Sequence, residues 1–419
     1  MPQSVETSSL SSTPEERPNP TNVGGQAVIE GVLMRAPGSL AIVCRKRDGS
    51  LVLRERTVSA PASGLLKAPF VRGIHTLVSS LKIGHQALRF SAEILEESLA
   101  EEEARAEEEA RAKKGASSKK APPGLATLAL MTVAQWLLAS PEEEEDEDAK
   151  DPKKAKEPPK SAPVAEAAPE TKSAASGIAM AIPILFAIGL FIALPQLAAE
   201  GVNSAFKLDL GVTSPGFQAI TGAAKLTIII GYLSAIRLIP DVRRVFQYHG
   251  AEHKAISTYE AGKDLLVAEA RPTSALHARC GTTFIIMVAF VSVVLFSAVG
   301  AFLPPIPGPR IVQSLLFFLM KLPLLPVIAG ITFEIQRVFA RYCTTGPLRV
   351  LLLPGFLVQK ITTAPPDDDQ LEVALASLRS ALANAPVKLP ESHPDKAYTS
   401  YAELVEDVVP DGFAEPRPA

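Results

Sequence analysis

Residues 246–256, which read FQYHGAEHKAI, hold the side chains best suited to chemistry. His249 and His253 are four residues apart, so on a helix both imidazoles project from one face and can bind one metal ion. Glu252 lies beside them, and this H-x-x-E-H order occurs in metalloenzymes whose histidines hold zinc and whose glutamate acts as a base. Gly250 weakens the expected helix. The stretch predicts His249 and His253 as metal ligands and Glu252 as the catalytic residue.

A second group of candidate ligands follows about 24 residues later. His277 and Cys280 have an H-x-x-C spacing, from which one ion can be chelated at a turn, and Arg279 lies between them. Glu260 and Glu334 could add oxygen ligands, although ion pairs with neighbouring arginines explain them more simply. We expect a divalent metal, with zinc as the first choice, because imidazole and thiolate are among its usual ligands.

Two uses of such a site stay open. Three protein ligands would leave one coordination position for water or substrate, as catalysis requires. If His277 and Cys280 both joined the two other histidines, four ligands would close a tetrahedron. A closed site of that kind would be structural.

Four long apolar runs surround these candidate ligands, at residues 178–199, 217–239, 282–303 and 311–331. Each approaches or exceeds the roughly 20 residues that a helix needs to cross a bilayer. The predicted fold class is therefore an α-helical polytopic membrane protein, with the lipid bilayer as its partner. Its membrane domain covers residues 176–362, with the candidate metal loop at 240–281.

Lysine and arginine counts predict the orientation, because these residues collect in cytoplasmic loops. The 240–281 loop contains six of them and residues 332–362 contain four more, whereas the other two loops hold only Lys207 and Arg310. The first twenty residues lack the apolar stretch of a cleaved signal peptide, and the three cysteines are odd in number and widely spaced. We therefore expect a protein of the bacterial inner membrane with both termini and reduced thiols in the cytoplasm.

Two lysines, Lys225 and Lys321, fall inside the predicted spans. An ionisable residue at such depth is costly and hints at a function. Snorkelling of the side chain toward the headgroups explains Lys225 more simply. Lys321 lies close to Pro323 and Pro326, which would kink or break its helix, and its role stays undecided.

The N-terminal part is expected to form a small α+β cap in the cytoplasm. Residues 1–22 are rich in Ser, Thr, Pro and Glu and read as disordered. In the segment 23–99, residues 41–47 and 51–58 have strand character, and Asp48-Gly49 between them is a strong hairpin signal. Apolar residues at helical spacing then predict an amphipathic helix over 65–99.

The remaining segments are expected to be linkers and tails. Residues 100–175 form a charged, low-complexity linker with a short apolar helix at 125–139. Residues 348–361 are apolar but too short to span, which favours an interfacial position. Residues 363–419 read as a cytoplasmic tail, first a helix and then disordered. No nucleic-acid partner is expected, because the sequence has no basic stripe with interleaved aromatics.

Six blocks of this sequence resemble the YqhQ-like family of bacterial membrane proteins, which are described as predicted metal-dependent enzymes of unknown function. The blocks are GGQAVIEGVLMRAP (24–37), PFVRGI (69–74), VFQYHGAEHKAISTYEAG (245–262), LHARCGTTF (276–284), ITFEIQR (331–337) and PGFLVQKITTAPPDDDQLEVAL (354–375). The resemblance covers residues 23 to about 380 and implies metal dependence with the HGAEHK and HARCG blocks at its centre. The first block, with Glu30 as an accessory candidate, has no assigned role, and its glycines suggest a close backbone approach, against the metal loop for example.

The sequence therefore predicts a metal-dependent membrane enzyme, with hydrolysis as the expected reaction class. His249 and His253 would be ligands, His277 or Cys280 would complete the set, and Glu252 would act as base or acid. One alternative is a membrane scaffold or assembly factor with a structural zinc site. A small transporter that uses Lys321 is the other, although four spans without an internal repeat are few for one. Substrate, protein partners and homo-oligomer formation stay open.

Overall fold

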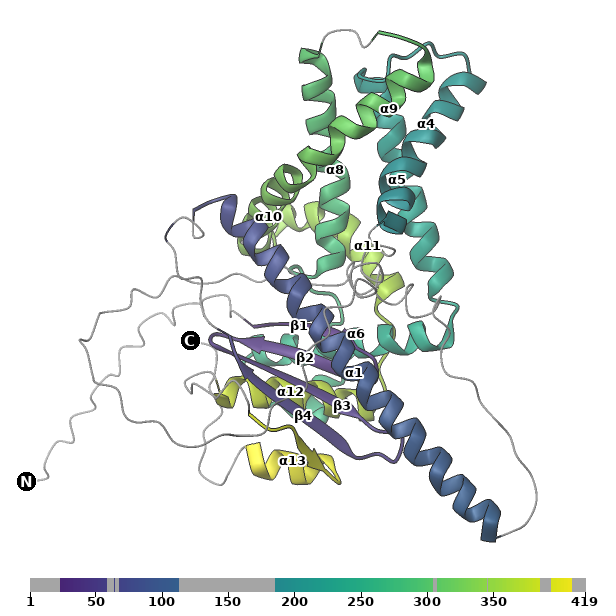
Figure 1. Ribbon diagram of the computed structural model, residues 1–419. Helices are drawn as coiled ribbons and strands as arrows, with labels where there is room; N and C mark the ends of the chain where they lie inside the picture. Colours follow the sequence, from purple (N-terminus) through teal and green to yellow (C-terminus); the bar gives the residue numbers. More distant parts are fainter. Residues whose placement is uncertain are drawn as a thin grey trace, which may run out of the picture.

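The computed structural model describes residues 23–58, 64, 68–112, 185–303, 307–344, 346–384 and 393–408. These residues form a sheet domain and, stacked on it, a domain made only of helices (Figure 1). The predictions for residues 1–22 and 125–139, and for most of the 100–175 linker, lie outside the described residues.

The sheet domain contains five antiparallel strands that follow one another in chain order. They are β1 (Gly24–Val28), β2 (Gly31–Ala36), β3 (Ser39–Arg45), β4 (Leu51–Thr57) and β5 (Lys396–Tyr398). The predicted hairpin is β3–β4, and its turn has Gly49 at a φ of 91°. The glycine-rich first block was not predicted as strands, yet it forms a second hairpin, β1–β2, which turns at Glu30 with a φ of 51°.

Strand β5 attaches the C-terminal part of the chain to the edge of β4. Beside it, Arg54 donates two hydrogen bonds to Asp395, with Nε–Oδ1 at 2.8 Å and Nη2–Oδ2 at 2.7 Å. This guanidinium lowers the pKa of the Asp395 carboxyl below its usual value. A bidentate pair of this kind fixes the geometry of a short edge strand more than it adds stability, because both groups are partly exposed.

We expect Asp395→Asn to lower the free energy of unfolding by about 0.5–1 kcal/mol at pH 7, the usual size for a well-formed surface pair. Folding lowers the pKa of this carboxyl, so its stabilising contribution is complete above the unfolded value of about 3.9 and is lost as the pH falls below it. Denaturant unfolding of wild type and variant at several pH values measures the difference. An equal difference at pH 7 and well below pH 4 would contradict the assignment.

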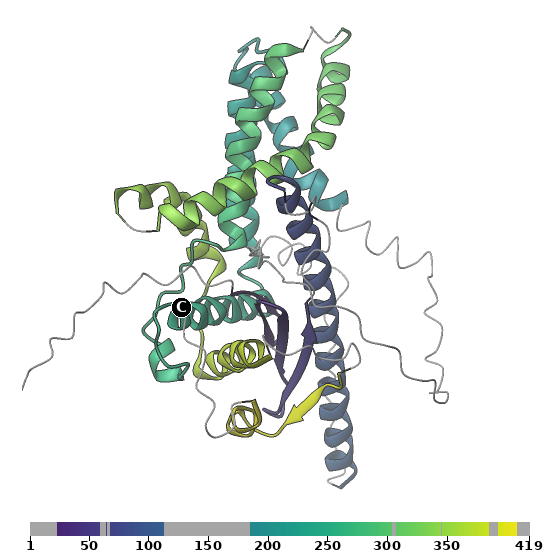
Figure 2. The same cartoon turned by 90° about the vertical axis from the view of Figure 1, so that its left-hand side faces the viewer.

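Helices cover both faces of the sheet (Figure 2). The long helix α1 (Val71–Ala112) lies across one face, where Ala87 and Phe90 pack on Leu33, Ile42 and Val52. The other face carries α6 (Pro240–Glu260) and α12 (Asp368–Asn384), side by side. This second core is the larger one, and it brings together strands, α6 and α12 from three distant parts of the sequence.

Helix α1 differs from the predicted helix over 65–99, because it begins later and continues through residue 112. The predicted linker therefore starts too early. Glu, Ala and Arg in residues 100–112 are strong helix formers. Lys46 also pairs with Glu97 at 3.4 Å and with Glu101 at 3.1 Å, so the end of the β3–β4 hairpin supports this part of the helix.

The segment predicted as a tail contributes to the sheet domain. Twelve of the seventeen residues of α12 are buried, and the Ser39 hydroxyl donates a hydrogen bond to the Ala381 carbonyl. The strand β5 and the helix α13 (Tyr401–Val408) follow, where disorder was predicted. That prediction is wrong for residues 393–408, because Tyr398 and Leu404 are apolar groups that this core buries.

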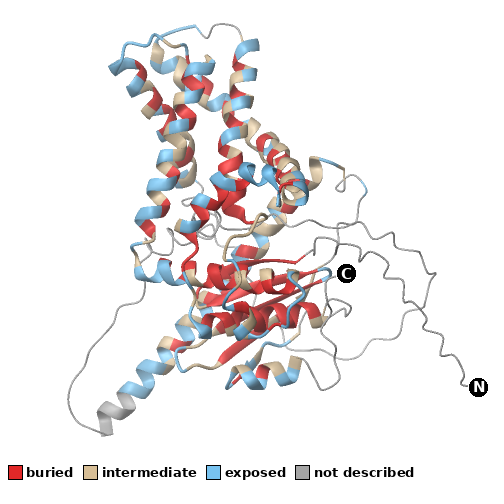
Figure 3. Ribbon diagram, turned by 180° about the vertical axis from the view of Figure 1, so that it is seen from behind, coloured by how far each residue is buried: buried red, intermediate tan, exposed pale blue. Residues whose placement is uncertain are grey.

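Four helical segments are long and apolar enough to cross a membrane: Leu185–Ala205, Pro215–Ile236, Gly281–Phe302 and Arg310–Tyr342. The first contains the π-helix η2 (Gly189–Ala193) and α4 (Leu194–Ala205), and the next two are α5 and α8. Much of their outward surface is exposed (Figure 3), and its exposed side chains include many large apolar ones, as a lipid environment would require. The prediction of four candidate spans is confirmed.

The last candidate span is longer than the predicted 311–331 and is broken in the middle. Its parts are α9 (Arg310–Lys321), the 3₁₀ turn η3 (Leu322–Leu324) and α10 (Leu325–Tyr342), and the chain bends sharply between the two α-helices (Figure 2). Pro323 and Pro326 remove two backbone donors at this point, which explains the break.

The apolar stretch 348–361 forms the 3₁₀ turn η4 (Pro347–Leu352) and α11 (Leu353–Thr362). Helix α11 packs against α8, and Gly355 allows the close contact, since a Cβ there would lie 2.6 Å from the Thr283 hydroxyl. The end of α11 leads directly to α12 and so connects the helical domain with the sheet domain.

Candidate metal centre

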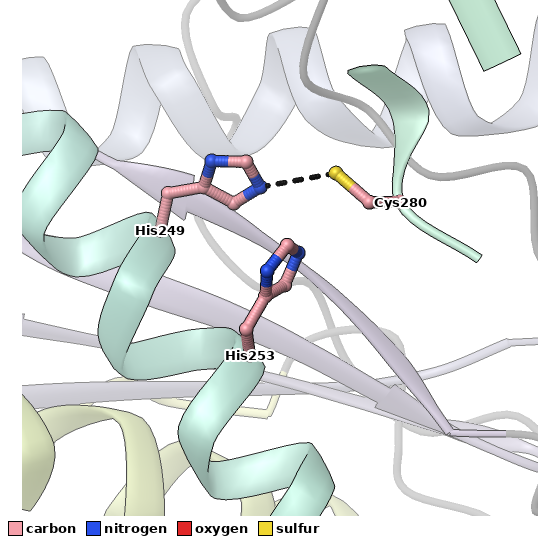
Figure 4. Close-up of side chains that lie close together, drawn as sticks. All are labelled: His249, His253 and Cys280. Carbon is pink, nitrogen blue, oxygen red and sulfur yellow. Dashed lines mark hydrogen bonds between the residues drawn. The ribbon is translucent and has the colours of Figure 1, made fainter. Parts of the chain in front are cut away.

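Helix α6 carries the H-x-x-E-H residues where the two domains meet. It begins at Pro240, which suits a first helical position, and it ends before Gly262, whose φ of 65° an L side chain rarely adopts. One face, with Tyr248 among others, packs into the sheet-domain core. His249 and His253 project toward the start of α8, as Figure 4 shows. The helical spacing predicted for these two residues is present.

Backbone carbonyls determine which nitrogen of each imidazole carries the proton. Nδ1 of His249 donates to the Thr362 carbonyl at 3.0 Å, and Nδ1 of His253 donates to the Ala275 carbonyl at 2.6 Å. A carbonyl oxygen can only accept, so each Nε2 keeps its lone pair. Metal-binding histidines have this same arrangement, in which a hydrogen bond at one nitrogen orients the other toward the ion.

The Nε2 of His253 has no hydrogen-bond partner in the part of the chain that is described, and the side chain is 1% exposed. A buried acceptor without a partner costs about 1–3 kcal/mol. Burial also lowers the pKa of His249 to about 4 and that of His253 well below its usual value. Both imidazoles are therefore neutral at neutral pH, the form that binds a metal ion.

Cys280 supplies the third donor from the N-cap of α8. Its Sγ lies 3.3 Å from Nε2 of His249 (Figure 4) and accepts a hydrogen bond from the Thr282 amide at 3.4 Å. Burial raises the pKa of the thiol to about 12, and the hydrogen bonds from Thr282 act in the opposite direction. The helix N-terminus, with its free amides, favours the thiolate that a metal ion would stabilise.

The donor set fits a small divalent cation. The ligand atoms of His249, His253 and Cys280 all lie within 4.8 Å of one another, and all three side chains are buried. Tetrahedral zinc, with bonds of roughly 2.0–2.3 Å, places its ligand atoms roughly 3.3–3.8 Å apart. Small side-chain shifts would therefore bring the three atoms around one ion. Two imidazoles and one thiol also match the preference of zinc for nitrogen and sulfur.

Glu252 lies at the edge of this cluster, 2% exposed, with Oε2 4.0 Å from Nε2 of His249. Gly25 of strand β1 packs directly on it, since a Cβ at Gly25 would lie 2.8 Å from Cγ of Glu252. This contact is the close backbone approach that the glycines of the first block suggested. It explains why the strand has glycine at this position and how the sheet domain positions the carboxylate.

Gly250 serves a similar purpose on the other side of His249. A Cβ at Gly250 would lie 2.3 Å from the Ala364 carbonyl oxygen, and the Ala364 amide donates to the Phe246 carbonyl at 2.9 Å. The chain after α11 is thereby held against α6, which places the Thr362 carbonyl at His249. Helix α6 is continuous through Gly250, so the expected weakening does not interrupt it.

A buried glutamine fixes the loop that carries Cys280. Gln359 of α11 accepts from the His277 amide at 2.9 Å, and its Nε2 donates to the His277 carbonyl at 2.7 Å and to the Thr283 hydroxyl at 2.8 Å. Three hydrogen bonds from one side chain define the path of the backbone before α8. Gln359 was not predicted as a functional residue, although it belongs to one of the six blocks that carry the family resemblance.

His277, Arg279 and Glu260, from the second group of candidates, lie beside the cluster. His277 places its Nε2 3.1 Å from Oε2 of Glu260, and Arg279 donates to the other oxygen of the same carboxylate. The His277 ring is 5.8 Å from the His253 ring. Of the two residues proposed to complete the ligand set, the structure brings Cys280 to the histidines and pairs His277 with Glu260.

Glu30 and Glu334 lie away from the three donors. Glu30 accepts hydrogen bonds from Arg244 and from the Tyr248 hydroxyl, and it joins the β1–β2 turn to α6. Glu334 accepts from Arg72 at 2.8 and 2.5 Å, and it joins α10 to the start of α1. Both contacts are ion pairs between elements, and for Glu334 an ion pair with a neighbouring arginine was the simpler expectation.

Comparison with known proteins identifies the family. The family model described as "Protein of unknown function (DUF1385)" matches residues 68–384. The uncharacterized protein YqhQ of Bacillus subtilis (strain 168) is 27% identical over 366 residues, which make up 87% of this chain and 93% of that protein. No solved structure matches the chain. The resemblance found in the six blocks is thus confirmed, and the chain belongs to the DUF1385 family, which includes YqhQ-like proteins.

Proposed function

We propose that this chain is a multi-pass protein of the bacterial inner membrane that binds zinc at its cytoplasmic face. The four candidate spans support insertion, and the excess of lysine and arginine at the sheet-domain end of the helices supports a cytoplasmic sheet domain and termini. The single observation that carries the metal site is the buried group of His249, His253 and Cys280, with Nε2 of His253 left without a partner among the described residues.

We further propose that the site is catalytic, with hydrolysis as the reaction class. Three protein ligands leave one coordination position free, as in catalytic zinc sites. A bound zinc ion would supply Lewis acidity and lower the pKa of a coordinated water to about 7. Glu252, the residue before His253, has its Oε2 4.0 Å from Nε2 of His249 and would accept a proton at that oxygen and pass it to a leaving group. His249 and His253 are held by carbonyls, so they would keep their orientation through such a cycle.

A structural zinc site is the second candidate, and one observation favours it. Glu252 is as deeply buried as the three ligands, and its carboxylate oxygen lies 4.0 Å from the Nε2 of His249. A small movement would make it the fourth ligand and close the tetrahedron. The ion would then join α6 of the sheet domain to α8 of the helical domain, as expected for a scaffold.

Cobalt substitution of wild type and Glu252→Gln separates the two candidates, because Co²⁺ takes zinc-like geometry and its visible spectrum reports the ligands. For an open site we expect cyanide to change the wild-type spectrum. We also expect Glu252→Gln to bind Co²⁺ within about threefold of the wild-type affinity, since a base is not a ligand. Loss of at least about tenfold in affinity, together with a wild-type spectrum that cyanide leaves unchanged, would show a closed site with Glu252 as ligand.

Glu260→Gln is the matched control for this experiment. Glu260 is also an acidic residue of α6, but it pairs with His277 and Arg279 outside the three-donor group. The cobalt spectrum and affinity of this variant should equal those of wild type. A change as large as that of Glu252→Gln would mean that His277 belongs to the ligand set and would contradict the proposed assignment.

A further inference from the structure

A second polar cluster lies in the middle of the helical domain, away from the metal centre. A small pocket there is enclosed by α5, α8, the end of α9 and the π-helix η2. Lys225 and Lys321 both line it, together with Ser292 and Phe296. Lys225 is the eleventh residue of the 22-residue α5, so the pocket lies near the midplane if the helices span a bilayer.

The two ammonium groups converge on this pocket with few partners. Lys321 is 2% exposed, and its Nζ donates to Oε1 of Gln196 at 2.8 Å. The Nζ of Lys225 donates to the Ser292 hydroxyl at 3.0 Å. Both nitrogens lie within 6 Å of the centroid of one ring, that of Phe296. An ammonium group has three N–H donors, so both lysines keep donors that no described protein group accepts.

No acidic side chain is among the described residues that line the pocket. The hydroxyls cannot compensate for the charge, because Ser292 already donates to the Ala289 carbonyl and Thr221 to the Phe217 carbonyl. Two positive charges in a medium of low dielectric constant repel each other and lose their hydration, at a cost of several kcal/mol. An anion between them would remove the repulsion and accept the remaining N–H groups.

The backbone is irregular at this pocket on two sides. Ile192, which lines it, belongs to the π-helix η2, and Lys321 is followed at once by the 3₁₀ turn η3. π-helical turns within α-helices occur frequently at functional sites, and interrupted spanning helices are the usual setting of ion sites in membrane proteins. Both irregularities thus support a binding site over a chance pairing of two lysines.

The pocket also limits the size of its occupant, since the free space in it is that of about one water molecule. We propose that the helical domain binds a small inorganic anion, with chloride as the expected species, between the ammonium groups of Lys225 and Lys321. The site requires neither the metal centre nor its proposed catalysis.

Equilibrium binding of radioactive chloride to the full-length chain in detergent tests this proposal, with gluconate replacing chloride at constant ionic strength. We expect saturable binding that approaches about one chloride per chain, with affinity at least about tenfold lower in Lys225→Met and in Lys321→Met. The matched control is Lys82→Met, on the exposed side of α1. Sulfate and phosphate should compete weakly, because they exceed the pocket.

If either lysine variant fails to fold, a measurement on the wild-type protein alone still tests the proposed chloride site. Its thermal midpoint should rise with chloride and not with equal concentrations of gluconate, because a ligand that binds only the folded chain stabilises it. Absence of saturable chloride binding to wild type would overturn the proposal. Wild-type affinity in two well-folded lysine variants, or equal competition by phosphate, would also overturn it.

Discussion

The double variant His249→Ala, His253→Ala should lose its metal almost completely, from about one ion per chain to less than about a tenth of that. Both side chains are ligands in the proposed site, and only Cys280 would remain of the three buried donors. A single thiol, whose pKa burial raises to about 12, holds its proton too tightly to retain an ion by itself. Elemental analysis of the purified chain measures the loss directly.

A matched double variant guards against non-specific metal on surface histidines. His75 and His85 lie on α1 and outside the three-donor group, so His75→Ala, His85→Ala should keep the wild-type metal content. Circular dichroism shows whether each variant keeps its helices. Full metal content in a folded His249→Ala, His253→Ala protein would contradict the metal site and with it the proposed enzyme.

Gly250→Ala should destabilise the protein although alanine is the better helix former. In an open helix position this change stabilises by up to about 1 kcal/mol. At Gly250 the new Cβ would lie 2.3 Å from a backbone carbonyl oxygen, that of Ala364, which cannot rotate away as a side chain can. Overpacking of this kind costs about 1–3 kcal/mol, so the net effect is a loss.

The displacement should also reach the metal centre. Ala364 lies two residues after Thr362, whose carbonyl accepts the hydrogen bond that orients the His249 imidazole. If the new Cβ pushes Ala364 away, the position of His249 as a metal ligand is disturbed as well. We expect a lower thermal midpoint and weaker metal binding together. The control is Gly231→Ala in the second half of α5, where a Cβ meets nothing within 4 Å. Equal thermal midpoints for Gly250→Ala and Gly231→Ala would contradict the close contact.

Patterns within short stretches of sequence predicted the elements that depend on local chemistry. The four apolar runs became the four candidate spans, and Asp48-Gly49 became the turn of β3–β4. The four-residue spacing of His249 and His253 placed both imidazoles on one side of α6. In each of these cases, the residues that decide the structure belong to one continuous stretch of the chain.

Features that depend on distant partners were missed. Helix α12 contains Arg379, Ser377 and Ser380, which read as a solvated helix, yet all three are buried. Two of them have partners far away in the sequence: Ser377 donates to the Ala41 carbonyl and Arg379 to the Leu265 carbonyl. No periodicity within α12 contains that information.

The choice between His277 and Cys280 could not be made from spacing either. Both residues lie in the loop before α8 and both are suitable zinc ligands. Gln359 of α11 binds the His277 backbone, and Glu260 of α6 binds its imidazole, so the ring turns away while Cys280 caps the helix. Only the tertiary contacts of two other helices distinguish the two candidates.

The sheet domain is built from segments that are far apart in the chain, so these segments become available for folding at different times during synthesis. Strands β1 to β4 are translated long before α12, which together with α6 covers their larger core, and Ser39 is 342 residues from its partner Ala381. All four hydrophobic segments are translated in between. The part of the apolar face that α12 covers therefore stays exposed on the early strands until α12 has been translated, and exposed β-structure of this kind is prone to aggregation.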